Sequence, residues 1–291
     1  MSWRVVVVSG NAKVDYKMNY LAIRKLDETR RVHITEIGVL ILESTAISIT
    51  AYAMCELIQH KVKVIFCDRQ RNPLGEVMPL YGSHDTSDRV RSQVRWSREH
   101  KDLVWREIVR AKIKGQRDVL LAQGRSAASL LTGYLEQLTP GDATNREGHA
   151  AKVYFNALFG LGFSRDGDSP VNGALNYGYS LLLSAVNREI AAAGYITQLG
   201  IFHDNAFNPY NLGCDFMEPL RPLVDHEVVC MRPEALGKEE KMALVRLLNR
   251  EVRVDGRRHH LLYAIRLYCA GLFKALQSGD VEEIKMIEYE L

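Results

Sequence analysis

The chain has 291 residues, of which 47% are hydrophobic and 25% are charged. This composition excludes a disordered, collagenous or disulfide-dense protein, and the length suits one large or two modest domains. No stretch approaches the roughly 18 to 20 consecutive apolar residues of a membrane span, and the first residues lack the layout of a signal peptide. The five cysteines are scattered, so we expect a reduced, cytoplasmic compartment.

The net charge of +3 is distributed unevenly along the chain. Residues 89–117 carry ten basic and three acidic side chains, whereas residues 118–291 carry 17 basic and 22 acidic ones. The basic excess is therefore concentrated in one short segment, and that segment is a candidate for contact with phosphates.

The first 86 residues predict a small β-rich domain. Short runs of β-branched and aromatic residues bounded by Gly, Asn, Asp and Thr indicate strands. Helical spacing indicates one helix over residues 50–60, and a hairpin element is expected near residues 72–80. The strands are expected at residues 3–8, 13–26, 31–34, 39–42 and 62–66.

From residue 87 onward, helical periodicity replaces the strand pattern. With a linker near residues 81–87, we expect an α+β fold in which a small β domain, residues 1–86, precedes a larger all-α domain, residues 87–291. Gly, Ser, Asp and Pro separate the expected helices, which cover residues 87–122, 126–139, 143–159, 171–193, 215–230, 238–252 and 257–277.

The basic segment predicts a helix with one apolar and one cationic face. On a helical wheel, the apolar stripe comprises Val90, Val94, Val104, Trp105 and Ile108. The adjoining sector holds the candidate DNA-binding residues Arg91, Arg95, Arg106, Arg110 and Arg117. Guanidinium groups suit phosphates. The alternative is a solvated face whose arginines pair with acidic residues elsewhere in the chain.

A carboxylate at position 147 is expected to face inward. Glu147, Ala151, Tyr154 and Leu158 are spaced so that they share one helix face. An unpaired charge there would cost several kcal/mol, so it needs a partner such as a metal ion. The alternative is a capping box, in which Glu147 bonds the N-cap amide of Thr144.

A second group of polar residues lies at 203–221. A helix beginning near Asp215 places Asp215, Glu218 and Arg221 on one face, and His203 ends an apolar run. One imidazole with carboxylates suits Mg²⁺ or Mn²⁺ better than structural zinc. Taken singly, Asp215 fits an N-cap, and His203 a hydrogen-bonded structural residue, better than either fits a metal ligand.

Together these segments resemble a known family, the CRISPR-associated integrase/endonuclease of spacer acquisition, in the short form that accompanies type II systems. The resemblance covers essentially the whole chain. Ile65–Asp68 and Pro79–Tyr81 are similar to the type II branch. The central motifs are Glu147-Gly-x-Ala-Ala-x-x-Tyr-Phe, Val171-Asn-x-Ala-Leu-Asn-Tyr-Gly-Tyr-Ser-Leu-Leu, Gly200-x-x-His203 and Asp215-x-Met-Glu218-x-x-Arg221-Pro.

The resemblance implies a β-sandwich-like N-terminal domain used for dimerisation and a helical, metal-dependent catalytic domain. By family position, Glu147, His203 and Glu218 would be catalytic and would hold Mg²⁺ or Mn²⁺, with Asp215 and Arg221 beside them. The implied partners are a second copy of the chain, a small companion adaptation protein whose dimer bridges two such dimers, protospacer duplex DNA, leader–repeat DNA and other type II CRISPR proteins. No membrane partner is implied, and the resemblance implies the cytoplasm of a prokaryotic cell.

The implied activity is insertion of protospacer DNA into a CRISPR array. A 3′-hydroxyl would attack the phosphodiester at the leader–repeat junction, and a divalent ion would stabilise the developing charge. His203 would serve as a neutral ligand or as a proton donor to the leaving oxygen, and the sequence leaves both roles open. Two alternatives remain: a non-enzymatic DNA-binding scaffold, and a metal-dependent nuclease that only cleaves branched DNA.

Overall fold

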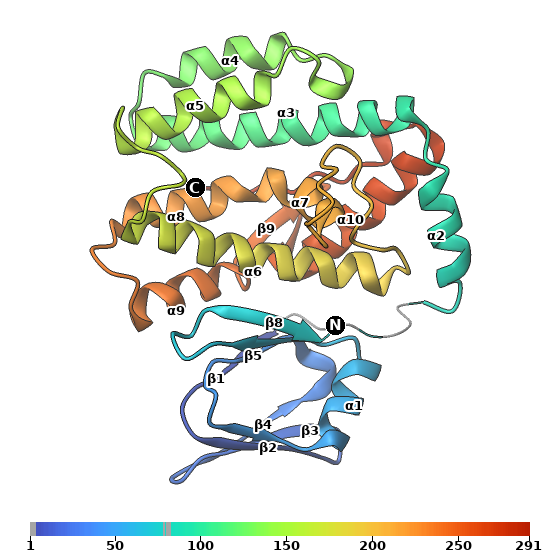
Figure 1. The fold of residues 1–291 in the computed structure, drawn as a ribbon, viewed down its shortest axis with the longest axis vertical. Coiled ribbons are helices and arrows are strands. Elements are labelled where there is room, and N and C mark those ends of the chain that lie inside the picture. Colours follow the sequence, from blue (N-terminus) through green and yellow to red (C-terminus); the bar gives the residue numbers. More distant parts are fainter. Residues whose placement is uncertain (1–3, 78, 80–82) are drawn as a thin grey trace.

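The computed structural model describes residues 4–77, 79 and 83–291. Two stacked sheets lie at one end and a helical body at the other (Figure 1). Residues 80–82 lie outside the described part, and they include the beginning of the predicted linker and the end of the Pro79–Tyr81 motif. The strand-rich half followed by a helical half confirms the predicted α+β class.

The first sheet has the strand order β1-β5-β7-β8. Three of its strands, β1 (Arg4–Val8), β5 (Ile37–Leu42) and β7 (Lys63–Cys67), are parallel, and β8 (Pro73–Val77) is antiparallel to β7. All six residues of β5 are buried, as expected for a strand covered on both faces of its sheet.

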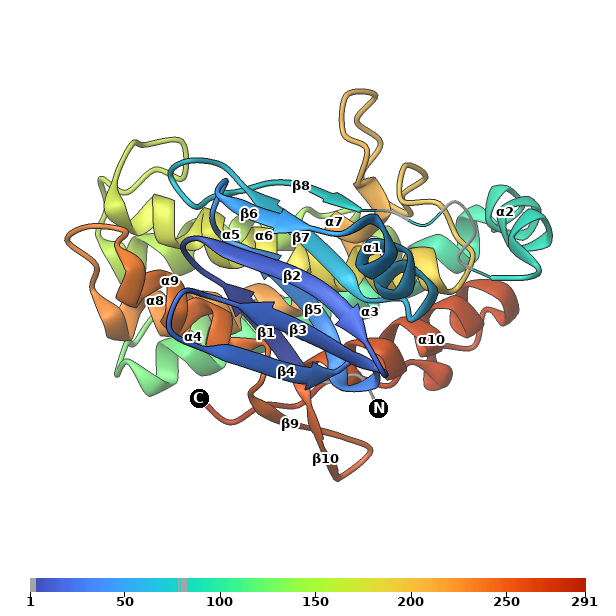
Figure 2. The same cartoon turned by 90° about the horizontal axis from the view of Figure 1, so that it is seen from below.

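The second sheet has the order β4-β3-β2-β6. It lies below the first sheet in Figure 1 and in front of it in Figure 2, beside α1 (Ala51–Gln59). Its strands are β2 (Ala12–Lys17), β3 (Tyr20–Arg24), β4 (Thr29–His33) and β6 (Ile47–Ile49). Two sheets packed face to face are the sandwich-like arrangement that the sequence resemblance implied.

The first sheet is the middle layer of the molecule. Because successive side chains of a strand point to opposite faces, Val39 and Ile41 of β5 join the hydrophobic core of the helical body, whereas Leu40 and Leu42 join the core between the sheets. The sheet therefore connects the two halves through both of its faces.

The helical body is built around two long helices, α3 (Arg98–Ala122) and α6 (Pro170–Ala192). In Figure 1, α4 (Ala128–Glu136) and α5 (Arg146–Phe159) cover α3, and α6 lies on the side of the sheets. The remaining helices are α2 (Thr86–Val94), α7 (Asn211–Met217), α8 (Arg221–Met231), α9 (Lys238–Leu247) and α10 (Leu261–Ser278).

The helix predicted over residues 87–122 is in fact two helices. It is interrupted after α2, and α3 begins beyond Ser97, whose extended backbone and side-chain oxygen cap the new helix by accepting a hydrogen bond from His100 N at 3.1 Å. A serine N-cap inside a continuous polar pattern is sufficient to start a new helix axis. Arg91 and Arg95 therefore do not share a helix with Arg106, Arg110 and Arg117.

The helix predicted over residues 215–230 begins one turn earlier and has three parts: α7, the 3₁₀ turn Glu218–Leu220, and α8. Pro219 and Pro222 cause the division, because each lacks an amide hydrogen and stands in the first turn of the part that follows.

The predicted helices over residues 238–252 and 257–277 are shortened at their junction by a hairpin. β9 (Glu251–Val254) and β10 (Arg257–His260) pair across Asp255 and Gly256, which both have positive φ. Asp-Gly is a typical two-residue hairpin turn. The domain that was predicted as all-α thus contains one small antiparallel ribbon. No helix of the described residues has the length and apolarity needed to cross a membrane.

Candidate active site

Glu147 lies in the first turn of α5, but it does not cap that helix. Asp142 accepts hydrogen bonds from Arg146 N and Glu147 N, both at 2.9 Å, and Asn145 accepts one from Gly148 N at 3.3 Å. The capping-box interpretation, with its cap at Thr144, is therefore wrong. Because other side chains satisfy the amides, the Glu147 carboxylate is available for an interaction outside its own helix.

That interaction is with Lys112, a buried residue of α3. The Lys112 ammonium bonds Glu147 Oε1 and lies 2.5 Å from Glu218 Oε2. Sequence reasoning missed this lysine, although a signal was present: it stands four residues after Ile108 and seven after Trp105, and so continues their buried stripe. A lysine on an apolar stripe requires a partner in the interior.

Glu218 contacts two cationic side chains, Lys112 and Arg221. Its other oxygen, Oε1, accepts a hydrogen bond from Arg221 Nε at 2.8 Å. Burial opposes ionisation of this carboxyl group, but the charges of Arg221 and Lys112 outweigh it and lower its pKa to about 2. Arg221 also stacks its guanidinium over the ring of Tyr179, 4.5 Å from the centroid. Glu218 is consequently an anion held in a fixed orientation.

His203 is oriented by Asp215. Asp215 is fully buried and accepts hydrogen bonds from Ile201 N at 2.6 Å, Phe202 N at 3.2 Å and His203 N at 3.0 Å. It also lies 2.6 Å from His203 Nδ1. This last hydrogen bond raises the pKa of His203. With Nδ1 donating to the carboxylate, Nε2 of the neutral ring is the free acceptor.

The structure excludes the N-cap interpretation of Asp215, because α7 already begins at Asn211. It also explains Gly200 in the motif before His203. A Cβ at Gly200 would lie 2.2 Å from the His203 carbonyl oxygen and 2.8 Å from Asp215 Oδ2. A larger residue would push the loop away from the carboxylate that orients the imidazole.

An aromatic stack positions the same loop against α3. The rings of Trp105 and Phe202 are parallel, with centroids 4.2 Å apart, and His203 meets Trp105 edge-on at 5.9 Å. Because Trp105 and Lys112 are seven residues apart on one helix face, α3 presents the ammonium and the aromatic support to the same side.

The predicted site residues are thus brought together in two linked groups. Lys112 joins Glu147 to Glu218, and Asp215 holds His203, whose pKa is raised further by the charges of Glu218 and Glu147. Within the described residues, no three His, Cys, Asp or Glu side chains are placed closely enough to hold a metal ion as they stand, and the Lys112 ammonium lies between the two carboxylates. The donor set, two carboxylates and an imidazole with a free Nε2, fits a hard divalent ion. The metal assignment itself stays a prediction.

The candidate DNA-binding arginines differ in their surroundings. Glu107 pairs with Arg106 at 2.8 Å and with Arg110 at 3.2 Å, and Arg117 pairs with its neighbour Asp118 at 2.7 Å. These partners belong to α3 itself and not to the acidic remainder of the chain. Arg91 and Arg95 are exposed on α2 and at its C-terminal end. Their role in binding DNA stays a prediction.

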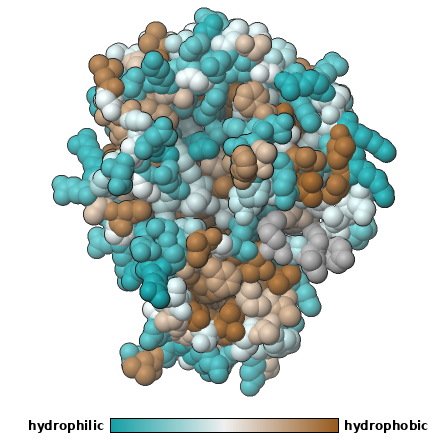
Figure 3. Space-filling model, in the orientation of Figure 1, coloured by the Kyte–Doolittle hydropathy of each residue, from teal (hydrophilic) through white to brown (hydrophobic). Residues whose placement is uncertain are grey.

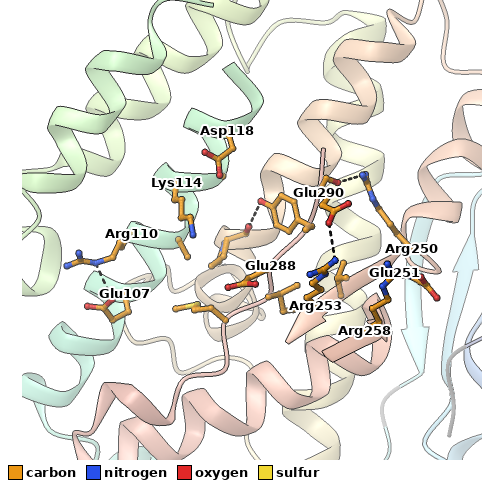
Figure 4. A pocket seen from close by; sticks show the side chains of 17 residues that line it. Glu107, Arg110, Lys114, Asp118, Arg250, Glu251, Arg253, Arg258, Glu288 and Glu290 are labelled. Atoms are coloured by element: carbon orange, nitrogen blue, oxygen red, sulfur yellow. Dashed lines mark hydrogen bonds and ion pairs between the residues drawn. The ribbon is translucent and has the colours of Figure 1, made fainter. Parts of the chain in front are cut away.

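A separate groove of about 820 Å³ lies on the side of α3 that faces the β9–β10 hairpin and the C-terminal segment (Figure 4). Arg110 is the one predicted site residue in its lining. The C-terminal segment pairs with β9 through two backbone hydrogen bonds between Arg253 and Glu288, and Tyr289 donates to the carbonyl of Pro219 at 3.1 Å. The groove is therefore next to the turn that carries Glu218 but does not contain the carboxylates.

Comparisons of sequence agree with the motifs. The family described as CRISPR associated protein Cas1 matches residues 5–240. The CRISPR-associated endonuclease Cas1 of Neisseria meningitidis serogroup C (strain 8013) is 32% identical over 294 residues, which cover 99% of this chain and 97% of that protein. A second relative, the CRISPR-associated endonuclease Cas1 2 of Pyrobaculum aerophilum, is 27% identical and covers 81% of this chain and 84% of its own.

Comparisons of structure give the same fold. A casposase bound to integration product superposes with a TM-score of 0.76 at 21% identity, over 96% of this chain and 92% of that one. A Cas1 protein from Thermotoga maritima superposes with a TM-score of 0.74 at 18% identity, over 94% of this chain and 97% of that one. With a family match over most of its length and a relative of 32% identity across nearly all of it, the chain belongs to the Cas1 family of CRISPR-associated proteins.

Proposed function

We propose that this chain is a divalent-metal-dependent DNA integrase that joins protospacer DNA to a CRISPR array, using Glu147, His203 and Glu218. The observation that carries the proposal is the convergence of Glu147 and Glu218 on one cation beside an imidazole held by a buried carboxylate. The relatives named as Cas1 endonucleases and the casposase bound to integration product support joining as the reaction.

Each residue has a role that follows from its contacts. Glu147, Glu218 and Nε2 of His203 would hold Mg²⁺ or Mn²⁺, which, when bound, stabilises charge on the phosphate under attack. Asp215 fixes the imidazole tautomer and Arg221 fixes the Glu218 carboxylate. The arginines of α2 and α3 would bind the DNA backbone.

The proposed assembly is a homodimer bridged by a small companion protein. Two solved structures of similar fold are described as Cas6-RT-Cas1–Cas2 complexes, which supports a Cas2-type companion. The surface of the sheets supports a contact with a second copy: apolar side chains gather over the lower part of the face in Figure 3, where Figure 1 places the sheets. Exposed apolar residues of the sheet half include Met18, Tyr20, Tyr52, Phe66 and Leu74.

One joining assay separates the three candidate functions. The protein and its companion are incubated with a labelled 3′-hydroxyl duplex and leader–repeat DNA, in Mn²⁺ or in EDTA. If the protein is an integrase, the label becomes covalently attached to the repeat DNA in the Mn²⁺ reaction and not in the EDTA reaction. If the protein is a nuclease that only cleaves, hydrolysis products form and no label is attached. If it is a non-enzymatic scaffold, it binds DNA equally well in Mn²⁺ and in EDTA.

Isosteric variants test the assigned carboxylates. Glu147→Gln and Glu218→Gln are each expected to lower the joining rate by at least about a hundredfold while DNA binding persists, because removing a charge-stabilising contact in such a site typically costs that much. The matched control is Glu136→Gln, an exposed carboxylate on the neighbouring helix α4, which should join at the parental rate. Joining that survives Glu218→Gln would refute the assignment.

A further inference from the structure

Lys112 lies in this site, but it belongs to none of the sequence motifs and the proposed reaction assigns it no role. Its side chain is 9% exposed, and its ammonium contacts the carboxylates of both Glu147 and Glu218. A buried ammonium is costly unless its charge is compensated, and here two proposed metal ligands compensate it.

We propose that Lys112 is an internal cation that holds the two carboxylates together in the metal-free protein and competes with the divalent ion for them. This inference rests on the proposed metal-dependent function. The physical reason is charge balance: without a cation, Glu147 and Glu218 would face each other across a partly buried space, and like charges at such distances repel strongly. The ammonium removes that repulsion, and the incoming ion must displace it.

The position of Lys112 indicates that a metal ion can displace its ammonium, and that the contact with the two carboxylates is not a permanent structural ion pair. Glu218 keeps Arg221 on its other oxygen, at 2.8 Å, so this carboxylate stays oriented when the ammonium leaves. The lysine side chain has four rotatable carbon–carbon bonds, and its ammonium can withdraw while its stem stays packed on α3. Trp105, on the same helix face, carries the stacked loop of His203 and does not depend on the ammonium.

The first test measures Mn²⁺ affinity calorimetrically on the full chain without DNA. A charge within a few ångströms changes the proton affinity of a carboxyl group by about one to three powers of ten. On that scale, Lys112→Gln should bind Mn²⁺ roughly ten- to a hundredfold more tightly than the parent. The matched control is Lys114→Gln, which removes an exposed lysine of the same helix and should bind Mn²⁺ like the parent.

A second readout is thermal stability. In EDTA, Lys112→Gln should melt at a lower temperature than the parent, because two carboxylates have lost their common cation. Mn²⁺ should then raise the melting temperature of the variant by more than it raises that of the parent. If the single variant does not fold in EDTA, the double variant Lys112→Gln/Glu147→Gln should fold, since it removes a carboxylate together with the ammonium and leaves Glu218 paired with Arg221.

The outcomes separate this inference from the function on which it rests. If the parent binds Mn²⁺ and Lys112→Gln binds it no more tightly, the competition is refuted while the metal site stands. If the parent binds no Mn²⁺ and Glu147→Gln leaves the joining rate unchanged, the proposed metal-dependent function is refuted, and this inference is refuted with it. A double variant that also fails to fold would show that the ammonium acts on something other than these carboxylates.

Discussion

At the scale of single residues, the hydrogen bond from His203 Nδ1 to Asp215 decides how the imidazole is presented. Asp215→Asn keeps the shape of the side chain but removes the charge and one acceptor. We expect the pKa of His203 to fall in this variant, because the contact with Asp215 is the main cause of its elevation. The joining rate should fall roughly ten- to a hundredfold, as is typical when the partner of a ligand is lost.

The measurement is an NMR titration of the imidazole in EDTA, so that no metal competes with the proton. The matched control is Asp204→Asn, which changes an exposed carboxylate next to His203 in the chain and should leave the titration midpoint where it is in the parent. An unchanged midpoint in Asp215→Asn would mean that this hydrogen bond does not set the protonation of the ring.

Prediction from sequence was most successful for residues whose chemistry depends on local spacing. Glu218 and Arg221 were expected to lie together because they are three residues apart, and Glu218 does bond Arg221. Asp215, expected on the same helix face, instead bonds His203 and the backbone of its loop. Lys112 was missed because its partners come from α5 and from the turn after α7, and no spacing rule relates segments so far apart in the chain.

At the scale of the element, the break between α2 and α3 changes what the basic segment is expected to do. The arginines of α3 are paired with acids of their own helix: Arg106 and Arg110 share Glu107, and Arg117 pairs with Asp118, so together they offer less net charge to a phosphate than three unpaired arginines would. Arg91 and Arg95 are exposed on the other helix. Arg91→Ala/Arg95→Ala should weaken DNA binding and reduce the slope of log affinity against log salt by up to about 2.

The comparison is a salt titration of duplex binding with a matched double variant. Arg106→Ala/Arg110→Ala removes the same formal charge but also frees Glu107, so its slope should change by less than that of the α2 variant. An equal reduction for both pairs would show that the ion pairs on α3 open when DNA binds.

The misjudged elements have a common physical cause. Ser97, Pro219 and the Asp255–Gly256 turn each act through a local backbone preference, whereas periodicity is read over longer windows. A single cap or turn inside a periodic stretch leaves the periodic signal nearly intact. The interruptions were therefore visible only as individual residues. The same holds in the first half: β5 was predicted correctly, but the single strand predicted over residues 13–26 is the hairpin of β2 and β3, which turns at Met18 and Asn19, and β6 was not predicted.

At the scale of the whole molecule, the helical body is held to the first sheet by a buried polar contact as well as by the shared core. Lys63 of β7 lies 2.5 Å from Glu76 of β8, and Ser184 of α6 donates to the same carboxylate at 2.9 Å. The side chains of the ion pair are 2% and 8% exposed. Burial lowers the pKa of Lys63 in spite of the neighbouring carboxylate.

Glu76→Ala should therefore destabilise the protein by about 1 to 3 kcal/mol at pH 7, because the buried Lys63 ammonium and the Ser184 hydroxyl both lose the carboxylate that they contact. The effect depends on pH in a defined direction. A lysine whose pKa is lowered by folding binds fewer protons in the folded than in the unfolded state, so its contribution to stability rises with pH, up to the unfolded value near 10.5. The loss in Glu76→Ala should be smaller at pH 9.5 than at pH 7.

Denaturant unfolding at the two pH values measures this difference. The matched control is Glu36→Ala, which breaks an ion pair with Arg4 in which both side chains are 42% exposed, and it should cost at most about 1 kcal/mol at either pH. A variant that unfolds like the parent at pH 7 would show that the buried pair of Lys63 and Glu76 does not help to hold the two halves together.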